Sequence, residues 1–537
     1  MSIRAYIALA LWFLTFGVLL LDAHWAALWP SIVAVSTVFL VRRAITGLLA
    51  GATSAMILLH QGNPASAFVA FFSDHLLPSL QSSWNLSILI FTLLLGGFAA
   101  VVSKGGGINA LLHRWIHNQR AGRRMLMASA YGLGLACFFD GLANSLLVGR
   151  TLQEPSRRLG ISGEKLAYIV DSTSSAVACV AVMSTWIAYQ LSMIREGFTL
   201  AGVEATSNPF HLFLQSIPYN FYCWFTLILL AVVILKDWNL GPMRLAEAEA
   251  LNSGKPDDAS ESLSEAQVSH PAKSLRAIIP LLILTFGLLA GLYWDGTGGN
   301  LFPLHLSRVS EAFGKADAAL VMLVVSSLAC LTAVLLNAPS IRKQGVSVSA
   351  TFMEGVQHLF QPICILISAW IFSSTLEPLQ TVNVLAAILQ GQFPNWLFPL
   401  VVFLTGALIS FSSGTSWGTM GVLMPLALPL AIHLSNAPDG PLVIGTIAAV
   451  FSGAVFGDHC SPLSDTTIVS SISCGIEPFA HVRTQLPYAL LAAFVAVMAG
   501  FLPTGLGTPA PASLLLGGAL LVSLSFLFSR NQPSPHA

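Results

Sequence analysis

Charged residues are scarce in this sequence. Asp, Glu, Lys and Arg make up 9% of its 537 residues, whereas hydrophobic residues make up 55% and the mean hydropathy is +0.76. An average soluble domain carries about 25% charged residues. This shortage excludes a soluble globular protein. It predicts an all-α polytopic membrane protein, because segments that cross lipid must satisfy their backbone groups internally.

Net charge and paired cysteines are also lacking. The 24 Lys and Arg residues balance 24 Asp and Glu residues, and the basic residues form only short clusters. The sequence therefore indicates no nucleic-acid partner. Seven cysteines are scattered through apolar segments without a CxxC pair, which favours small buried side chains over disulfides or metal ligands. No pattern indicates a bound cofactor.

Long apolar runs, in contrast, are abundant. A bilayer core about 30 Å thick needs roughly 20 apolar residues per helix. The first run, residues 3–21, has no convincing cleavage site and is predicted to be a transmembrane helix rather than a removed signal. In all we predict about 12 spans, at residues 3–21, 25–41, 44–60, 85–103, 164–190, 216–236, 275–293, 318–337, 351–376, 442–475, 487–502 and 510–528.

Two further apolar stretches, 124–150 and 397–433, do not behave as single spans. Arginines flank the first stretch at both ends, and positively charged loops tend to stay in the cytoplasm. We therefore predict a re-entrant hairpin that enters from the cytoplasmic side. The second stretch has no Lys or Arg at either end, which fits a hairpin from the outer side. These assignments place both termini in the cytoplasm and leave only three basic residues outside: Arg195, Arg308 and Lys315.

A polar stretch at residues 237–276 is predicted to be a flexible cytoplasmic linker, because its acidic residues lie among Ser, Ala and Pro. It divides the chain into residues 1–236 and 277–537. Each half contains a hairpin followed by a broken helix, at 164–190 in the first half and at 442–475 in the second. Since the hairpins enter from opposite sides, the pattern predicts an inverted-topology repeat.

The most informative polar cluster lies within the apolar stretch 442–475. Asp458 and Asp465 occur there among glycine, proline and hydroxyl residues. A charged Asp at the centre of a membrane helix costs about 2.5–3.5 kcal/mol on insertion scales, so an Asp at that depth usually binds or carries something. We predict an ion site at a broken helix, with Asp458 and Asp465 as the Na⁺ candidates. Further groups for an ion or proton are predicted from both halves: Asp171, Asp140, Asn144 and His459.

Hydroxyl groups near these acids supply the hard oxygens that Na⁺ prefers. The candidate ligands are Ser461, Ser464, Thr466, Ser412, Thr415, Ser416, Ser172, Thr173 and Ser184. Two structural alternatives stay open. Any single Ser or Thr can bond the carbonyl four residues earlier in its own helix. His459 fits a proton relay, and it fits equally a hydrogen-bond donor that orients Asp458 or Asp465.

One motif points to a different function. Gly414-Thr-Ser-Trp-Gly418 matches the G-x-S-x-G pattern of serine hydrolases. That pattern requires a strand–turn–helix elbow, whereas this motif lies between two apolar runs of helix length. A hairpin tip and a close helix approach explain its glycines better. We therefore expect that the protein is not an enzyme.

Five motifs together resemble the NhaC family of Na⁺/H⁺ antiporters. They are Phe139-Asp140 with Asn144, Lys165-Leu-Ala-Tyr-Ile-Val-Asp-Ser-Thr173, Ser184-Thr-Trp186, Gly414-Thr-Ser-Trp-Gly-Thr419 and Gly457-Asp-His-Cys-Ser-Pro-Leu-Ser-Asp-Thr-Thr467. The resemblance implies a multi-pass secondary transporter of the bacterial inner membrane, often a homodimer, that exchanges Na⁺ for H⁺. Because similar proteins include malate/lactate exchangers and amino-acid carriers, an ion-coupled carrier of a small organic anion or amino acid is the alternative.

The sequence departs from this family pattern at two positions. Many members carry a second acidic residue where this chain has Gly141, and many carry proline where it has Ala176. The missing carboxylate at Gly141 leaves one group fewer for a cation or proton. It therefore places more of the expected ion chemistry on Asp458 and Asp465.

Overall fold

The described part of the chain is helical and contains no strand. The structure is a computed structural model, and it describes all residues except 1–2, 108–109, 111–121, 204–207, 254–273, 301, 303–304, 390–393, 436 and 530–537. The predicted all-α fold is thus confirmed. It follows from the long apolar runs, since a helix is the only open-ended element whose backbone groups are all satisfied within one segment in lipid.

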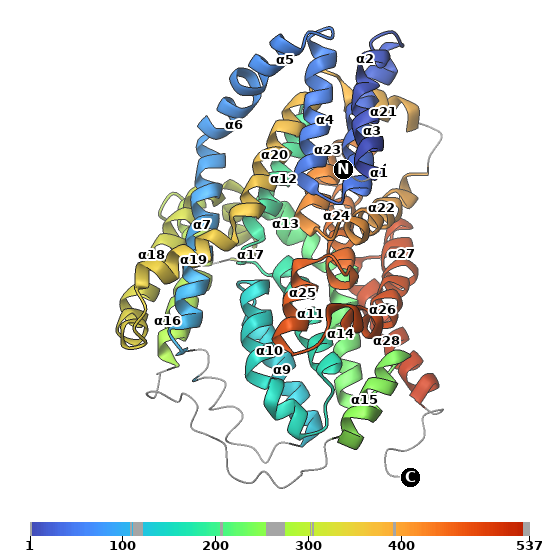
Figure 1. Cartoon of the computed structure of the whole chain (residues 1–537). Helices are drawn as coiled ribbons and strands as arrows, with labels where there is room; N and C mark the ends of the chain where they lie inside the picture. Colours follow the sequence, from blue (N-terminus) through green and yellow to red (C-terminus); the bar gives the residue numbers. More distant parts are fainter. Residues whose placement is uncertain are drawn as a thin grey trace.

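Helices up to residue 253 belong to the first half of the chain (Figure 1). They are α1 (Ile3–Phe13), α2 (Thr15–Val18), α3 (Ala23–Val41), α4 (Ala44–Leu59), α5 (Pro64–Ala70), α6 (Leu77–Gln81), α7 (Ser83–Lys104), α9 (Arg123–Ala136), α10 (Gly141–Arg158), α11 (Gly163–Val180), α12 (Ile187–Leu200), α13 (Pro209–Ser216), α14 (Phe221–Lys236) and α15 (Pro242–Ser253).

Helices from residue 275 onward form the second half. They are α16 (Leu275–Gly296), α17 (Leu306–Lys315), α18 (Ala318–Lys343), α19 (Val348–His358), α20 (Phe360–Leu376), α21 (Thr381–Leu389), α22 (Phe398–Ser413), α23 (Ser416–Ser435), α24 (Pro441–Cys460), α25 (Asp465–Ser473), α26 (Pro478–Val495), α27 (Leu502–Gly505) and α28 (Ala510–Ser529).

Eight helices or continuous helical segments in the described ranges are long and apolar enough to cross a membrane. The count reaches 11 when each of three bent pairs is taken as one span. One of these pairs is α19 and α20, which meet at 42° where the sequence predicts one straight span, residues 351–376. A polytopic membrane fold is therefore confirmed, while the count of about 12 spans stays a prediction.

The two predicted hairpins are helix–break–helix units. In the first, α9 ends before Cys137 and α10 begins after Asp140; in the second, Gly414 follows α22 and α23 begins at Ser416. Figure 1 shows α9 and α10 in the lower half of the view and α22 and α23 in the upper half, with α25 between them. The side of the membrane from which each hairpin enters, and hence the inverted repeat, stays a prediction.

The prediction of a flexible linker over 237–276 is wrong for its first part. Residues 242–253 form α15, and Trp238, Met243 and Glu247 are buried. Arg123 forms ion pairs with both Asp237 and Glu247, so the charges that indicated a solvated segment are partly neutralised by the body of the protein. The average composition of residues 237–276 does not reveal that one face of α15 is buried. Residues 254–273 of the predicted linker lie outside the described part.

Candidate functional site

The helix that carries Asp458 is broken directly after it. Ser461 has an extended backbone, Pro462 lacks the N–H that a continuing helix needs, and α25 restarts at Asp465. A Cβ at Gly457 would overlap the backbone of Phe411, so this glycine allows α24 to pack closely on α22. The broken segment is thereby fixed against the second hairpin.

Two breaks in the first half are also joined. The carboxylate of Asp140 caps α10 by accepting a hydrogen bond of 2.6 Å from the backbone N–H of Ala143. The N–H of Thr185, in the break between α11 and α12, donates to the carbonyl of Phe139 over 3.0 Å. The break at 181–186 and the tip of the first hairpin therefore form one unit.

These breaks meet at a pocket with a volume of about 80 Å³. Its acidic side chains are Asp140 from the first half and Asp458 and Asp465 from the second. The other lining residues come from both hairpin tips, the two broken helices and the start of α20: Gly141, Leu142, Thr185, Trp186, Leu359, Gln361, Pro362, Ile365, Gly414, Thr415, Ser416, Trp417 and Thr466. We call this the tip pocket.

The two carboxylate oxygens of Asp458 differ in their hydrogen bonds. Its side chain is buried, with 4% of the residue exposed, and Oδ1 accepts a hydrogen bond of 2.7 Å from Ser464. Oδ2 is buried and has no hydrogen-bond partner among the described residues. A buried carboxylate oxygen in this position needs a proton, a cation or a water.

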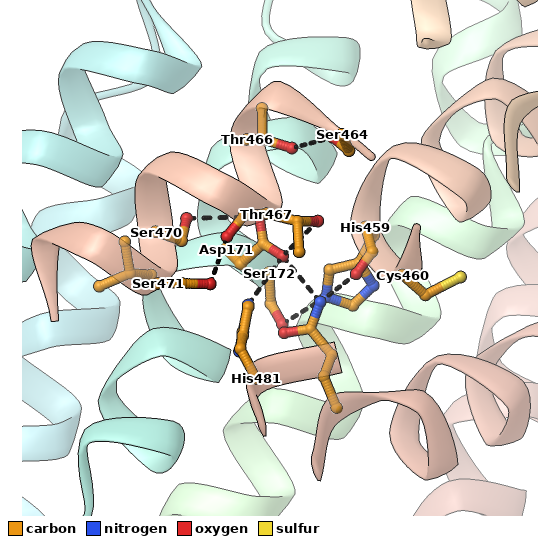
Figure 2. A network of polar contacts seen from close by, with 12 residues as sticks. Asp171, Ser172, His459, Cys460, Ser464, Thr466, Thr467, Ser470, Ser471 and His481 are labelled. Carbon is orange, nitrogen blue, oxygen red and sulfur yellow. Dashed lines mark hydrogen bonds and ion pairs between the residues drawn. The ribbon is translucent and has the colours of Figure 1, made fainter. Parts of the chain in front are cut away.

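Asp171 lies outside the tip pocket in a network of its own (Figure 2). It is fully buried, and its carboxylate accepts hydrogen bonds from Gln485 at 2.7 Å and Thr467 and Ser470 at 3.4 Å each; His481 Nε2 lies 3.2 Å from it. These partners belong to α25 and α26. The structure therefore places Asp171 behind the tip pocket with both oxygens engaged.

His459 does not orient either acid, and that alternative is wrong. Its Nε2 lies 2.8 Å from the hydroxyl of Ser172, and its Nδ1 lies 2.8 Å from the hydroxyl of Tyr222. Gln485 donates to the backbone carbonyl of the same residue. The imidazole points away from the carboxylate of Asp458 because α24 carries adjacent side chains about 100° apart.

The predicted hydroxyl ligands divide into two groups. Thr415, Ser416 and Thr466 line the tip pocket, and Ser464 reaches it indirectly through Asp458. The others, together with Asn144, mainly satisfy nearby groups: Ser412 bonds Ile409, Thr173 bonds Ile169, Ser184 bonds Ala178, Ser461 accepts from Leu463, Asn144 donates to Gly134 and Thr173, and Ser172 contacts His459. Among these residues only Thr173 bonds the carbonyl four residues earlier, as the structural alternative predicts, and the others are engaged by different nearby groups.

Several polar residues near the site were missed from the sequence. Thr185 and Gln361 line the tip pocket, and His481 and Gln485 surround Asp171. His481 and Gln485 are four residues apart, so they share one helix face. This signal was available, but the span predicted there began only at residue 487. In the same way, Gln361-Pro362 within an apolar run indicated the bend between α19 and α20.

Comparison with known proteins bears on these observations directly. The profile of the Na⁺/H⁺ antiporter family matches residues 177–505, more than half of the chain. The chain belongs to this family. It is therefore a multi-pass membrane transporter rather than an enzyme, and the resemblance to NhaC antiporters is confirmed. The Gly414-Thr-Ser-Trp-Gly418 motif lies at a helix–break–helix tip, without the strand that a hydrolase elbow needs.

Several known proteins are similar to the chain. An uncharacterised protein of Haemophilus influenzae is 29% identical over 488 residues, covering 89% of this chain and 90% of that protein. The NhaC Na⁺/H⁺ antiporter of Bacillus subtilis is 31% identical over 159 residues, 28% of this chain and 32% of the antiporter. A malate-2H⁺/Na⁺-lactate antiporter of the same species is 35% identical over 117 residues, 20% and 23% of the two chains.

A solved transporter shares the fold. The YdaH transporter of Alcanivorax borkumensis aligns with a TM-score of 0.56 and 17% identity, covering 87% of this chain and 90% of that one. At this identity the likeness shows the architecture alone. It supports the helical membrane fold of this member of the Na⁺/H⁺ antiporter family.

Proposed function

We propose that this chain is a secondary active transporter that exchanges Na⁺ for H⁺, and that the tip pocket is its ion site. Membership of the Na⁺/H⁺ antiporter family supports the exchange. The observation that carries the site is Oδ2 of Asp458, which is buried and has no hydrogen-bond partner among the described residues, on a side chain that lines a pocket built from both halves of the chain. No other acidic side chain that lines the tip pocket is as deeply buried.

The composition of the tip pocket fits a small cation. Carboxylate oxygens of Asp458 and Asp465 and hydroxyls of Thr415, Ser416 and Thr466 are the hard oxygens that Na⁺ accepts. The volume of about 80 Å³ leaves room for an ion with several waters. The three carboxylates that line the tip pocket repel each other when all are charged.

That repulsion explains why the pocket would exchange ions. A buried charge without a partner is costly, so the transporter changes its conformation readily only when the carboxylates hold a proton or a cation. Na⁺ and H⁺ compete for the same oxygens of Asp458. The transporter then changes conformation in one direction with Na⁺ bound and returns with H⁺ bound. Neither ion crosses the membrane without exchange for the other.

The test is Na⁺-driven proton movement in proteoliposomes that contain a pH-sensitive dye. Adding Na⁺ outside should alkalinise the interior for the wild type, and Asp458→Asn should abolish the signal. Asp439→Asn is the matched control, because Asp439 lies in the loop before α24 and outside the tip pocket. A thermal unfolding curve close to that of the wild type would show that the variant is folded. Wild-type exchange by folded Asp458→Asn would contradict the proposal.

An ion-coupled carrier of a small organic anion or amino acid is the second candidate. It is favoured by the malate-2H⁺/Na⁺-lactate relative and by Trp186 and Trp417, whose side chains line the tip pocket and offer apolar surface. The same vesicles distinguish the two functions. A pH change with Na⁺ alone supports simple antiport, whereas a signal that requires an added organic acid or amino acid supports the carrier.

The cellular setting belongs to the same proposal. We propose that the transporter lies in the bacterial inner membrane, as the family resemblance implies, with both termini in the cytoplasm, which the asymmetric basic residues support. Lipid contact is supported by large exposed apolar side chains such as Leu328, Leu331 and Leu335 on α18. A homodimer is supported by the family resemblance alone, and analytical ultracentrifugation in detergent would test it.

A further inference from the structure

Helix α25 has a cavity at each of its ends. The tip pocket takes Asp465 and Thr466 from its first turn. A larger cavity of about 400 Å³ takes Cys474, Gly475 and Ile476 just after its last turn. We call it the base cavity; its other walls are the end of α10, the start of α11 and part of α15. The nine residues of α25 span about 13 Å.

The interface between α10 and α25 runs from one cavity toward the other. Hydroxyls of Ser145 and Ser470 lie 3.0 Å apart across it. One turn further on, a Cβ at Gly149 would overlap the hydroxyl of Ser473. We call these four residues the α10–α25 seam. Side chains this small do not interlock, so the two helices can separate or slide without disrupting an apolar core.

The face of α25 beside the seam, toward α11 and α24, is polar as well. Ser470 donates to Asp171 at 3.4 Å, and Thr467, one turn earlier on α25, donates both to Asp171 at 3.4 Å and to the carbonyl of Asp458 at 2.9 Å. A row of oxygen atoms therefore extends from Asp458, which lines the tip pocket, to the middle of α25. A cation that moved along this face would exchange one set of oxygens for another.

The base cavity contains its own unsatisfied group. Ser156 is 2% exposed, and its hydroxyl has no hydrogen-bond partner among the described residues. Glu164, Glu249 and Arg157 also line the cavity. The carboxylate of Glu164 attracts cations, and Arg157 is engaged by Glu154, which weakens its opposing charge. A buried hydroxyl in a roomy polar cavity is the usual environment of bound water.

We propose that the α10–α25 seam is the gate through which the monovalent cation passes between the tip pocket and the base cavity. The inference rests on the proposed ion site and adds the route to it. In this structure the Ser145–Ser470 contact closes the seam. Separation of α10 from α25 connects the tip pocket to the base cavity, where Glu164 attracts hydrated cations.

A cross-link across the seam tests this directly. Ser145→Cys combined with Ser470→Cys should form a disulfide on oxidation and reduce Na⁺-driven exchange at least tenfold, with recovery on reduction. The control pair is Thr15→Cys with Ser54→Cys, whose native hydroxyls also lie close together, at 2.9 Å, between α2 and α4. Its cross-link should leave the rate unchanged. Each single variant, oxidised in the same way, accounts for the native cysteines.

The outcomes separate the gate from the ion site. Na⁺-dependent thermal stabilisation that persists in the cross-linked protein, with exchange lost, supports the gate. Full exchange in protein with a verified cross-link overturns it, whatever Asp458→Asn shows. If the reduced double variant loses both exchange and stabilisation by Na⁺, we attribute the loss to misfolding. Labelling of the native Cys474 then decides whether the gate exists.

Cys474 provides that second measurement without new cysteines. It lines the base cavity, so a small cationic methanethiosulfonate that reaches it should block the route. We expect at least tenfold slower exchange in labelled wild type and no inhibition in Cys474→Ser. Unchanged exchange after labelling of Cys474, verified by mass spectrometry, overturns the proposal.

Discussion

Ser464 donates a hydrogen bond of 2.7 Å to Oδ1 of Asp458, whereas Oδ2 of the same carboxylate has no partner in the described part of the chain. Ser464 immediately precedes α25 and Asp458 is near the end of α24. The contact therefore spans the helix break and holds one oxygen of a carboxylate whose residue lines the tip pocket. The break thus determines how the Asp458 carboxylate is held.

Ser464→Ala should weaken the apparent affinity for Na⁺. The hydroxyl contributes about 1 kcal/mol to orienting the charged carboxylate, so we expect the half-saturating Na⁺ concentration to rise roughly fivefold. The maximal rate should change little, because Oδ2 is untouched. Ser412→Ala is the control, since Ser412 bonds its own helix at Ile409. Equal effects of the two substitutions in the vesicle assay would contradict this role for Ser464.

Gly414 should tolerate no side chain. Its φ is +68°, and a Cβ there would lie 2.6 Å from the backbone carbon of Leu463 in the break between α24 and α25. We expect Gly414→Ala to displace the hairpin tip from the break and to lower exchange at least tenfold. Gly298→Ala separates strain from contact, because Gly298 has a φ of +60° but no neighbour within 4 Å of the added Cβ. Similar losses in both variants would rule out the contact as the cause.

Gln485→Leu should destabilise the protein. The amide donates to Asp171 over 2.7 Å and to the backbone carbonyl of His459, joining α26 to α11 and α24. Its loss leaves a buried charge with fewer donors, which costs about 1–3 kcal/mol of unfolding free energy. Gln344→Leu, at an exposed amide, should cost far less. Thermal unfolding in detergent measures both, and equal stability of Gln485→Leu and the wild type would contradict the prediction.

The helix breaks were predictable because they depend on local chemistry. Pro462 removes a backbone donor, and Gly414 permits a positive φ, so the sequence locates both interruptions. Asp458 was predictable because the cost of placing a carboxylate in lipid singles it out. These signals require knowledge of only a few neighbouring residues.

The partners of Asp171 were not predictable in the same way. His481 and Gln485 are 310 and 314 residues away in the chain. Their spacing on a helix reveals the face that they share, but not which helix lies opposite. The burial of α15 was concealed for a related reason, since its acidic composition describes the segment alone and omits Arg123, which neutralises part of it.

Glu247→Gln should loosen α15. Glu247 forms an ion pair with Arg123 and accepts a hydrogen bond of 2.8 Å from the N–H of Ser162 at the start of α11. The amide can keep the hydrogen bond, so the substitution removes chiefly the charge. Because the two side chains are only 17% and 3% exposed, we expect a loss of about 1–3 kcal/mol. Hydrogen exchange across residues 242–253 should rise.

Glu154→Gln is the matched control for this change. Hydrogen bonds from Arg157 and Arg158 lower the pKa of the Glu154 carboxyl, yet its side chain is 50% exposed and water screens the pair. Such exposed pairs contribute about 0–1 kcal/mol, so stability should hardly change. If both variants exchanged deuterium equally in α15, the Arg123–Glu247 pair would not be what docks this helix. Because α15 forms part of the wall of the base cavity, its docking also shapes that cavity.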